Sequence, residues 1–253
     1  MGGEFANDFD VFKVLIEING LLVNESSIRI GAPTISETGL GRLDLPIETM
    51  KIRCGDKIIE VPYIPGSSLK GVLRSLAEKI AKGMGCKVCE PFTDSPFKKE
   101  EAINGPCIIC RIFGGGYDKF RIASHVYVYD SLPVGDEPLI HARTRVAIDR
   151  FLGAARPGHL FTLEYIPPKI EWSFKMRLFN IDLEDRSDVR AKILIRVLQL
   201  LMDYGVHVGS MKSVGMGLVR LVKDKTEILK YKIESDGSLI SSRINFEKLL
   251  EGV

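Results

Sequence analysis

Four of the five cysteines stand in two C-x2-C pairs, and this pattern is the clearest sign of chemistry in the sequence. Residues 90–106 separate "CKVC" from "CIIC", which is a spacing typical of four-thiolate zinc sites. Four thiolates leave no coordination position for water, so the ion would be structural. Two disulfides are disfavoured in a cytosolic protein, and a redox dithiol would need only one pair. The sequence therefore predicts a structural Zn²⁺ held by Cys86, Cys89, Cys107 and Cys110.

A glycine-rich stretch near the C-terminus, "GVHVGSMKSVGMGLVRL" at 205–221, is the second candidate for chemistry. Glycine lets backbone N–H groups approach a ligand closely, and Lys212 adds a positive charge, so the stretch suits an anion. The Walker spacing of nucleotide-binding loops is absent, because no glycine directly precedes Lys212. The anion therefore need not be a nucleotide. A plain glycine-rich turn between a helix and a strand is the alternative.

The segment "PGSSLKGVLRSLAEKIAKG" at 65–83 predicts a helix. Ser67 or Ser68 can cap its N-terminus, its leucines, valine and isoleucine form one apolar stripe, and it ends at a glycine. Lys70 and Arg74 lie one turn apart, away from the centre of that stripe. Taken alone, such a pair is typical of a solvated helix face.

Other segments complete a mixed fold. Residues 12–23 alternate like a strand, and a strongly apolar helix at 186–205 can be capped by Ser187 or Asp188. With the irregular segments removed, the order is strand, helix, two strands, helix, strand. The sequence therefore predicts an α+β fold with a ferredoxin-like or RRM-like βαββαβ core.

The remaining segments are predicted to be additions to this core within one domain, 1–253. Residues 84–118 are too irregular for core elements and are interpreted as a zinc-binding insertion. Residues 141–158 form an arginine-rich excursion, and 223–253 form a C-terminal extension with a short helix near "INFEKLLEG". A short hairpin is predicted around "CGDK" at 54–57.

Composition limits the partners. The 253 residues carry 35 basic and 33 acidic side chains, so affinity for a nucleic acid must come from local patches rather than from the net charge of +2. No apolar run is long enough to span a bilayer, and the first residues lack the pattern of a signal peptide. We therefore expect a cytoplasmic protein that has no membrane partner.

Four segments in order resemble one known family. "VPYIPGSSLKGVLRSLAE", "CIICRIFGG", "RTRVAIDRFLGAARPGHLFTLEYIP" and the glycine-rich stretch are similar to the RAMP superfamily of CRISPR-associated proteins. The greatest likeness is to the repeated backbone subunit of type III (Csm/Cmr) effector complexes, over about residues 28–222. The resemblance implies a subunit that binds guide RNA beside further copies of itself and other effector subunits, and that cleaves the paired target RNA.

In that family, the first helix and the glycine-rich loop face the guide RNA. The resemblance therefore implies that hydroxyl, N–H and cationic groups of both elements contact RNA phosphates, which agrees with the anion-binding interpretation of the loop. These residues are Ser67, Ser68, Lys70, Arg74, Gly209, Lys212, Ser213, Gly215 and Gly217.

Residues 141–158 would correspond to the thumb of the family, a hairpin that intrudes between guide and target and displaces bases. Its arginines are the RNA-facing candidates. Internal ion pairs with Glu164 or Asp149 are the alternative for each of them. The candidates are Arg143, Arg145, Arg150 and Arg156.

Family members that cleave their target carry an aspartate ahead of the first helix, and Asp44 in "GRLDLPIETMK" fills this place. The implied reaction is attack of a ribose 2′-hydroxyl on the adjacent phosphate, assisted by Mg²⁺ or Mn²⁺. The chain departs from the commoner pattern, because Leu45 follows the aspartate where asparagine is usual and "GRL" precedes it where Gly-Gly is usual. The alternative is that Asp44 is an ordinary turn residue.

Two other functions compete with this one. A free-standing RAMP-type endoribonuclease that processes guide RNA would normally use histidine for acid–base work, and the four histidines form no paired arrangement in the sequence. A small-molecule enzyme would need a nucleotide fingerprint, which is absent. Both therefore rank below the backbone subunit.

Overall fold

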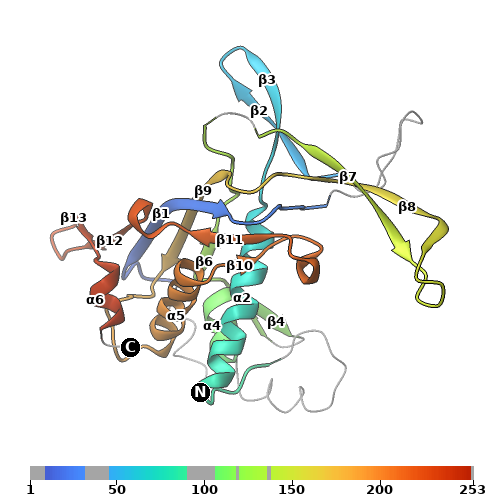
Figure 1. Ribbon diagram of the computed structural model, residues 1–253. Helices are drawn as coiled ribbons and strands as arrows, with labels where there is room; N and C mark the ends of the chain where they lie inside the picture. Colours follow the sequence, from blue (N-terminus) through green and yellow to red (C-terminus); the bar gives the residue numbers. More distant parts are fainter. Residues whose placement is uncertain (1–8, 32–45, 90–105, 118–119, 136–137, 252–253) are drawn as a thin grey trace.

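The computed structural model describes residues 9–31, 46–89, 106–117, 120–135 and 138–251. Within them, helices pack on a large antiparallel sheet, so the predicted α+β class is confirmed (Figure 1). None of the described helices is long and apolar enough to cross a membrane.

The sheet is organised around β1 (Leu15–Asn24). One edge of β1 pairs along nearly its whole length with β9 (Glu171–Phe179), whose other edge pairs with β6 (Val126–Val128). The opposite edge of β1 is shared, because β12 (Glu227–Ile233) pairs with its first half and β11 (Leu218–Leu221) with its second half. All of these pairs are antiparallel. Across the sheet the order β6, β9, β1, β11 results.

Short elements extend the sheet toward the C-terminus. β10 (Val206–His207) pairs with β11, and β13 (Leu239–Arg243) pairs with β12. The 3₁₀ helix η2 (Lys223–Lys225) connects β11 to β12. The predicted terminal helix is present as α6 (Phe246–Leu250), which is capped by Asn245. Residues 223–250 therefore add two strands and a helix to the body of the protein.

The first predicted helix is present as α2 (Gly66–Gly83), and it ends at the expected glycine. The predicted cap is wrong, because neither Ser67 nor Ser68 caps the helix. Instead, the N–H of Gly66 donates to Oδ1 of Asp130 at 2.7 Å. A carboxylate from the chain that follows β6 thus replaces a local cap, which sequence spacing cannot reveal.

The second predicted helix is α5 (Val189–Asp203), and Asp188 caps it by accepting a hydrogen bond from the N–H of Arg190. Both helices join the sheet in one hydrophobic cluster. Alternate side chains of β1 and β9 point into it, as expected for strands with one face covered. The fully or nearly fully buried members on these strands are Ile16, Ile18, Leu22, Trp172, Phe174, Met176 and Leu178.

The segment 84–118 is more than an irregular insertion, and this prediction needs correction. It contains α4 (Ile108–Phe113), whose Ile109 and Ile112 are completely buried in the main cluster. The short hairpin of β4 (Gly115–Tyr117) and β5 (Phe120–Ile122) follows. The second cysteine pair is therefore built into the core of the fold.

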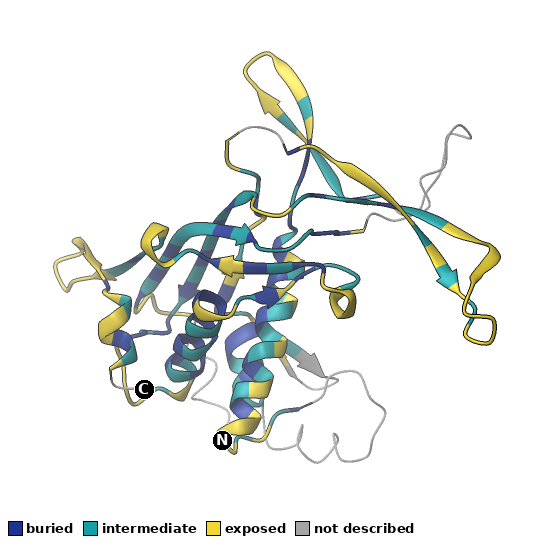
Figure 2. Ribbon diagram, viewed as in Figure 1, coloured by how far each residue is buried: buried dark blue, intermediate teal, exposed yellow. Residues whose placement is uncertain are grey.

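Two hairpins project from the body formed by the sheet and helices (Figure 1). One joins β2 (Thr49–Cys54) to β3 (Lys57–Pro62) and confirms the turn predicted around "CGDK". The other joins β7 (His141–Ile148) to β8 (Ala155–Tyr165), with an irregular register near its tip. Most of their residues are exposed, in contrast to β1 and β9, along which buried residues alternate with partly buried ones (Figure 2).

Candidate functional site

The glycine-rich loop leaves β10, passes through the 3₁₀ helix η1 (Lys212–Val214) and returns into β11. Gly209 and Gly217 have φ angles of 82° and 87°, in the left-handed region that favours glycine. A Cβ atom at either position would overlap a backbone carbonyl oxygen. Close packing of the loop therefore requires glycine at both positions.

The tip of the loop, residues 211–215, is different. Within the described part of the chain, the backbone N–H groups of Met211, Lys212 and Ser213 have no acceptor. Lys212 and Ser213 are exposed, and a Cβ atom at Gly215 would meet nothing within 4 Å. The tip thus offers N–H donors, a hydroxyl and an ammonium group to solvent, which is a donor set suited to an anion.

We expect the two kinds of glycine to respond differently to substitution. Gly217→Ala should lower the free energy of unfolding by about 3 kcal/mol or more, because left-handed strain adds to an overlap with the carbonyl of Val208. Gly215→Ala has only the backbone strain, about 1 kcal/mol. Urea denaturation of the two variants measures this difference, and equal losses would contradict it.

A short segment, residues 26–31, connects the loop to the β7–β8 hairpin, and its central residues 28–30 are buried. On one side, the N–H of Ser210 donates to the carbonyl of Arg29 at 2.9 Å. On the other side, Ile28 forms an antiparallel bridge with Ile166, just beyond β8. The loop and the base of the hairpin therefore pack against the same short piece of chain.

Arg29 holds this region together, and the sequence-based search missed it. Its Nη1 donates to Oγ of Ser210 at 2.8 Å, and its Nη2 donates to the carbonyl of Pro46 at 3.1 Å. The side chain is almost fully buried, and burial lowers the pKa of Arg29 although the charge of Glu164 opposes this effect. The only signal in the sequence was an arginine between two isoleucines, in "SIRIG".

The predicted catalytic residue, Asp44, lies outside the described residues. The chain on either side of residues 32–45 is described, and its two ends meet, because Gly31 and Ile47 form an antiparallel bridge. The N–H of Ile47 also donates to Glu164 on β8 at 3.1 Å. Gly31 and Pro46, which flank the undescribed residues, therefore lie beside Arg29, near both the glycine-rich loop and the hairpin.

Two of the predicted arginines lie toward the base of the β7–β8 hairpin. Nη2 of Arg145 lies 3.5 Å from Sδ of Met216, so this arginine touches the glycine-rich loop. The guanidinium of Arg143 lies 5.0 Å from the centroid of the Tyr165 ring, which is a cation–π contact. Both contacts fix arginines on the side of the hairpin that faces the loop.

The other two, Arg150 and Arg156, are exposed near the tip of the hairpin. Among the described residues, no ion pair joins any of the four arginines to a carboxylate. Asp149 instead accepts the N–H groups of Phe151 and Leu152 within the turn. The structure therefore does not contain the alternative ion pairs between these arginines and Asp149 or Glu164.

The predicted phosphate contacts on α2 occupy different surroundings. Ser67 is exposed in the first turn, whereas Lys70 and Arg74 are partly buried. Nζ of Lys70 donates to Oγ of Ser124 at 2.8 Å. Burial lowers the pKa of Lys70, and the charge of Arg74 lowers it further, so a nearby anion would be favourable. Neither side chain lies on an open solvated face.

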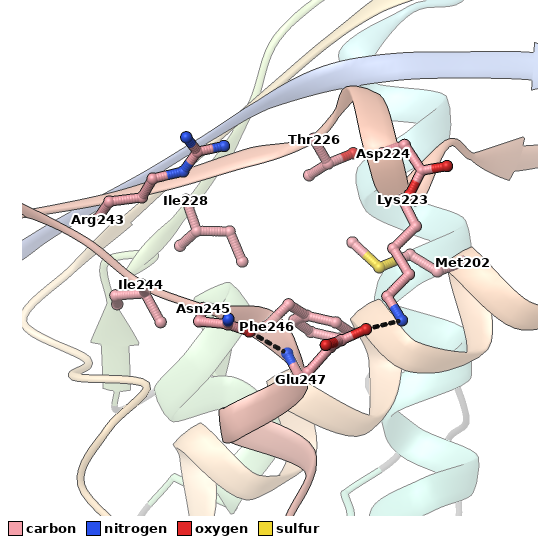
Figure 3. A pocket seen from close by; sticks show the side chains of 10 residues that line it. All are labelled: Met202, Lys223, Asp224, Thr226, Ile228, Arg243, Ile244, Asn245, Phe246 and Glu247. Atoms are coloured by element: carbon pink, nitrogen blue, oxygen red, sulfur yellow. Dashed lines mark hydrogen bonds and ion pairs between the residues drawn. The ribbon is translucent and has the colours of Figure 1, made fainter.

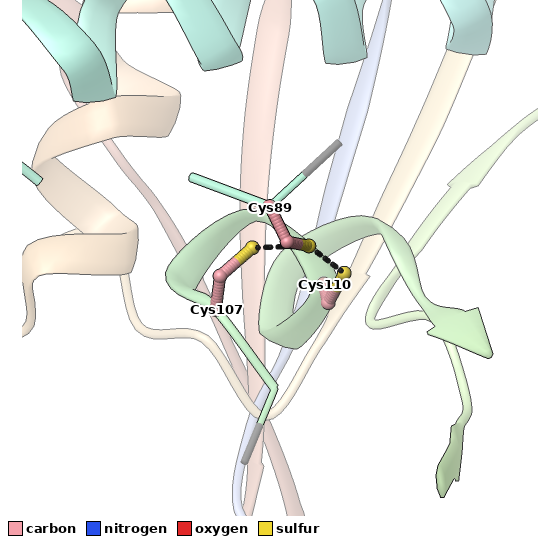
Figure 4. Close-up of side chains that lie close together, drawn as sticks. All are labelled: Cys89, Cys107 and Cys110. Atoms are coloured by element: carbon pink, nitrogen blue, oxygen red, sulfur yellow. Dashed lines mark hydrogen bonds between the residues drawn. The ribbon is translucent and has the colours of Figure 1, made fainter. Parts of the chain in front are cut away.

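Three of the four predicted metal ligands lie together (Figure 4). Sγ of Cys89 lies 3.1 Å from Sγ of Cys107 and 3.3 Å from Sγ of Cys110. Zinc–thiolate bonds of about 2.3 Å place sulfurs about 3.8 Å apart in a tetrahedron, so a small expansion accommodates the ion. Cys86 follows the end of α2, and its thiol is not part of this cluster.

The electrostatics of the thiols favour a cation. Hydrogen bonds from Cys110 and Cys89 lower the pKa of Cys107, whereas donating to Cys107 and Cys89 raises the pKa of Cys110. One thiolate is thus stabilised at the expense of its neighbours, because like charges this close repel. A divalent cation allows all three to ionise. The three cysteines can therefore hold a metal ion.

A hollow lies among the C-terminal elements, between α5, η2, β12, β13 and α6 (Figure 3). Its cationic side chains are already paired, since Lys223 contacts Glu247 at 2.9 Å and Arg243 contacts Glu227 at 3.6 Å. Asn245 is used as the cap of α6. The hollow therefore offers few unsatisfied groups to a ligand, and the candidate site remains at the glycine-rich loop and the cysteine cluster.

The family described as RAMP superfamily matches residues 26–220. These residues contain the glycine-rich loop, α2, the cysteine cluster and both hairpins. The elements after β11 lie beyond the match.

Three curated proteins with the same printed name are similar to the chain, "CRISPR system Cms endoribonuclease Csm3". The protein of Methanocaldococcus jannaschii is 27% identical over 89% of this chain and 85% of its own length. That of Streptococcus thermophilus is 26% identical over 87% of this chain and 94% of its own length. The protein of Methanothermobacter thermautotrophicus is 34% identical, but over only 40% of this chain and 34% of its own length.

Among solved structures, one chain titled "Type IV-B CRISPR Complex" is similar to this protein. The similarity has a TM-score of 0.56 and covers 82% of this chain and 89% of the other. Because the sequence identity is 21%, this likeness supports the fold alone.

Proposed function

Because the chain belongs to the RAMP superfamily, we propose that it is the guide-RNA-binding backbone subunit of a type III CRISPR interference complex and that it cleaves the paired target RNA. The names of the three curated relatives support both parts of this proposal, since two of them align over most of both chains. The partners would be guide RNA, target RNA, further copies of the chain and other effector subunits.

One observation carries the proposal. Ser210, which immediately precedes the exposed tip of the glycine-rich loop, bonds to Arg29, and so does Pro46, at one end of the segment that contains Asp44. The base of the β7–β8 hairpin bridges the neighbouring residue, Ile28. A phosphate-binding loop, a catalytic carboxylate and a base-displacing hairpin would need to meet the same stretch of RNA. Their convergence on the segment 26–31 suits that task.

The fold supports a finer assignment. The order β6, β9, β1, β11 across the sheet, with α2 and α5 packed on it, fits a ferredoxin-like core. We assign the β7–β8 hairpin as the thumb and residues 223–253 as a C-terminal extension of a single domain. The tip of the hairpin is apolar and exposed, since Phe151 is 96% and Leu152 is 72% accessible, which suits contact with unstacked bases.

Cleavage would depend on Asp44. Mg²⁺ or Mn²⁺ bound by this carboxylate would stabilise charge at the scissile phosphate. The chain supplies positioning through Arg29, which anchors the carbonyl of Pro46 two residues away. Lys212, Ser213 and the free N–H groups of the loop tip would hold the RNA backbone, together with Ser67, Ser68 and Lys70.

The cysteine cluster would be a structural zinc site. Thiolate ligands favour Zn²⁺ over the harder divalent ions, and α4 places two of them at the edge of the core. Cys86 is proposed as the fourth ligand, because C-x2-C spacing with Cys89 brings a second sulfur within reach of one ion. When bound, the ion would cross-link α4 to the chain that follows α2. It would take no part in catalysis.

The RNA interface is tested at the loop tip. Replacing Lys212 by alanine should weaken binding of all single-stranded RNA sequences about equally and reduce the salt slope by about one. The measurement is fluorescence anisotropy with two unrelated RNA sequences over a salt series. Lys79→Ala, an exposed lysine on α2, is the matched control and should change little. Unchanged affinity, or a loss for one sequence alone, would remove Lys212 from the phosphate contacts.

A further inference from the structure

We propose that Arg74 is a positioning residue of the metal–thiolate centre rather than a contact to RNA phosphate. This inference rests on the proposed metal site and reassigns a residue that the sequence placed at the RNA interface. Its basis is geometric, because all three nitrogens of the Arg74 guanidinium are engaged within the fold.

The contacts of Arg74 lead toward the cluster. Its Nη2 lies 3.8 Å from Sγ of Cys110, within the range of a hydrogen bond to sulfur. Its Nη1 donates to the carbonyl of Gly114 at 2.9 Å, and its Nε donates to Glu78 at 3.1 Å. The arginine therefore joins α2 to a cluster sulfur and to the C-terminal end of α4.

The carbonyl of Gly114 belongs to the turn that covers this sulfur. Gly114 has a φ angle of 79° and ends α4, with its N–H bonded to the carbonyl of Cys110 at 3.0 Å. At the next residue, Gly115, a Cβ atom would lie only 2.8 Å from Sγ of Cys110. By binding the Gly114 carbonyl, Arg74 fixes the turn that packs on the metal ligand.

Charge gives the reason for an arginine at this position. Three or four thiolates around a divalent ion leave a net negative charge, and the site is partly buried. A cationic donor aimed at a thiolate offsets that charge and orients the ligand, as outer contacts of metal ligands do. Arg74 is the cation that the structure places against the cluster through a hydrogen bond.

The same contacts connect the metal centre to the RNA-facing helix. Backbone atoms of Ser124 lie against Gly114, and Oγ of Ser124 accepts from Nζ of Lys70. Lys70 and Arg74 thus bind two neighbouring residues, Ser124 and Gly114, from the same helix. Arg74 would serve the metal, and Lys70, whose charge is not used by a sulfur or a carboxylate among the described residues, would serve the phosphate.

The experiment compares Arg74→Gln, Arg74→Lys and Lys70→Ala by competition for Zn²⁺ with a chromogenic chelator. Arg74→Gln loses the hydrogen bond to Sγ of Cys110, and this loss should weaken Zn²⁺ affinity about 10- to 100-fold. Lysine keeps the charge but cannot reach sulfur and carbonyl together, so Arg74→Lys should fall between this variant and wild type. Lys70→Ala should bind Zn²⁺ like wild type.

Two further readouts separate positioning from mere folding. In protein saturated with Co²⁺, Arg74→Gln should shift the sulfur-to-metal charge-transfer absorption, because a hydrogen bond to the thiolate is lost. With Zn²⁺ saturating, Arg74→Gln should bind RNA like wild type, whereas Lys70→Ala should bind less. Wild-type Zn²⁺ affinity and an unshifted spectrum in Arg74→Gln would overturn the inference. If zinc-saturated Arg74→Gln binds RNA more weakly than wild type, Arg74 contacts RNA phosphate after all. If the wild-type protein binds no metal, the zinc site itself is wrong.

Discussion

Replacing Asp44 by alanine is expected to slow guided cleavage of target RNA by about 10²–10⁴-fold, the range that a positioned acid–base or metal-binding group contributes. Guide binding and assembly should be unchanged, because the proposed phosphate contacts lie on the loop tip and α2 and do not include Asp44. The measurement uses the complex reconstituted with guide RNA, a matched target and Mg²⁺ or Mn²⁺. Products should be regularly spaced, since each copy along the guide would cut once.

The matched control is Asp56→Ala, an exposed aspartate in the turn of the β2–β3 hairpin. It removes the same charge at a site that no contact connects to the glycine-rich loop among the described residues. Full cleavage by Asp44→Ala would remove this residue from the mechanism. Absence of cleavage by the wild type under both metals would leave an RNA-binding subunit without activity.

The sequence predicted the local elements well. The apolar stripe at 65–83 correctly predicts α2, and the cap at Asp188 correctly predicts the start of α5. The turn at 54–57 correctly predicts the β2–β3 hairpin. These signals depend only on residues that are close together along the chain. It failed where a partner is distant. Asp130 caps α2, and no spacing rule connects it to Gly66 across the intervening chain.

The candidate site shows the same division. The spacing of the cysteines predicted a metal site with four thiol ligands. Three of these four cysteines lie together in the structure. The glycines were interpreted as ligand-binding, yet Gly209 and Gly217 serve packing against carbonyls that belong to other segments. Arg29 went unnoticed, because its role comes from Ser210 and the Pro46 carbonyl, which only the fold brings together.

The segment 84–118 was assigned outside the core for a related reason. Its apolar residues before Cys107 are scattered among polar ones, and the helical run "IICRIF" is too short to show periodicity. In the fold, α4 nevertheless buries Ile109 and Ile112 completely and carries Cys110 on the same turn. The cysteine cluster therefore lies between the core and the remainder of the segment, so loss of the proposed metal ion should destabilise the whole protein.

Replacing Cys110 by serine is accordingly expected to abolish stoichiometric zinc and to lower Tm substantially. Loss of a structural metal belongs to the small class of changes that cost more than about 4 kcal/mol. For a chain of this size, that cost corresponds to a decrease in Tm of about 8–16 °C. Elemental analysis and thermal unfolding, with and without a chelator, measure the two effects.

The exposed Cys54 provides the control, because Cys54→Ser removes a thiol that belongs to no cluster. This variant should keep about one equivalent of zinc and the Tm of wild type. Cys86→Ser should lose zinc affinity if its sulfur completes the tetrahedron. A chelator should lower the Tm of the wild type and leave Cys110→Ser unchanged, since that variant has no metal to lose. Less than about half an equivalent of zinc in wild-type protein purified without chelator would contradict the site, and α4 would then owe its position to contacts within the fold, including burial of Ile109, Ile112 and Phe113.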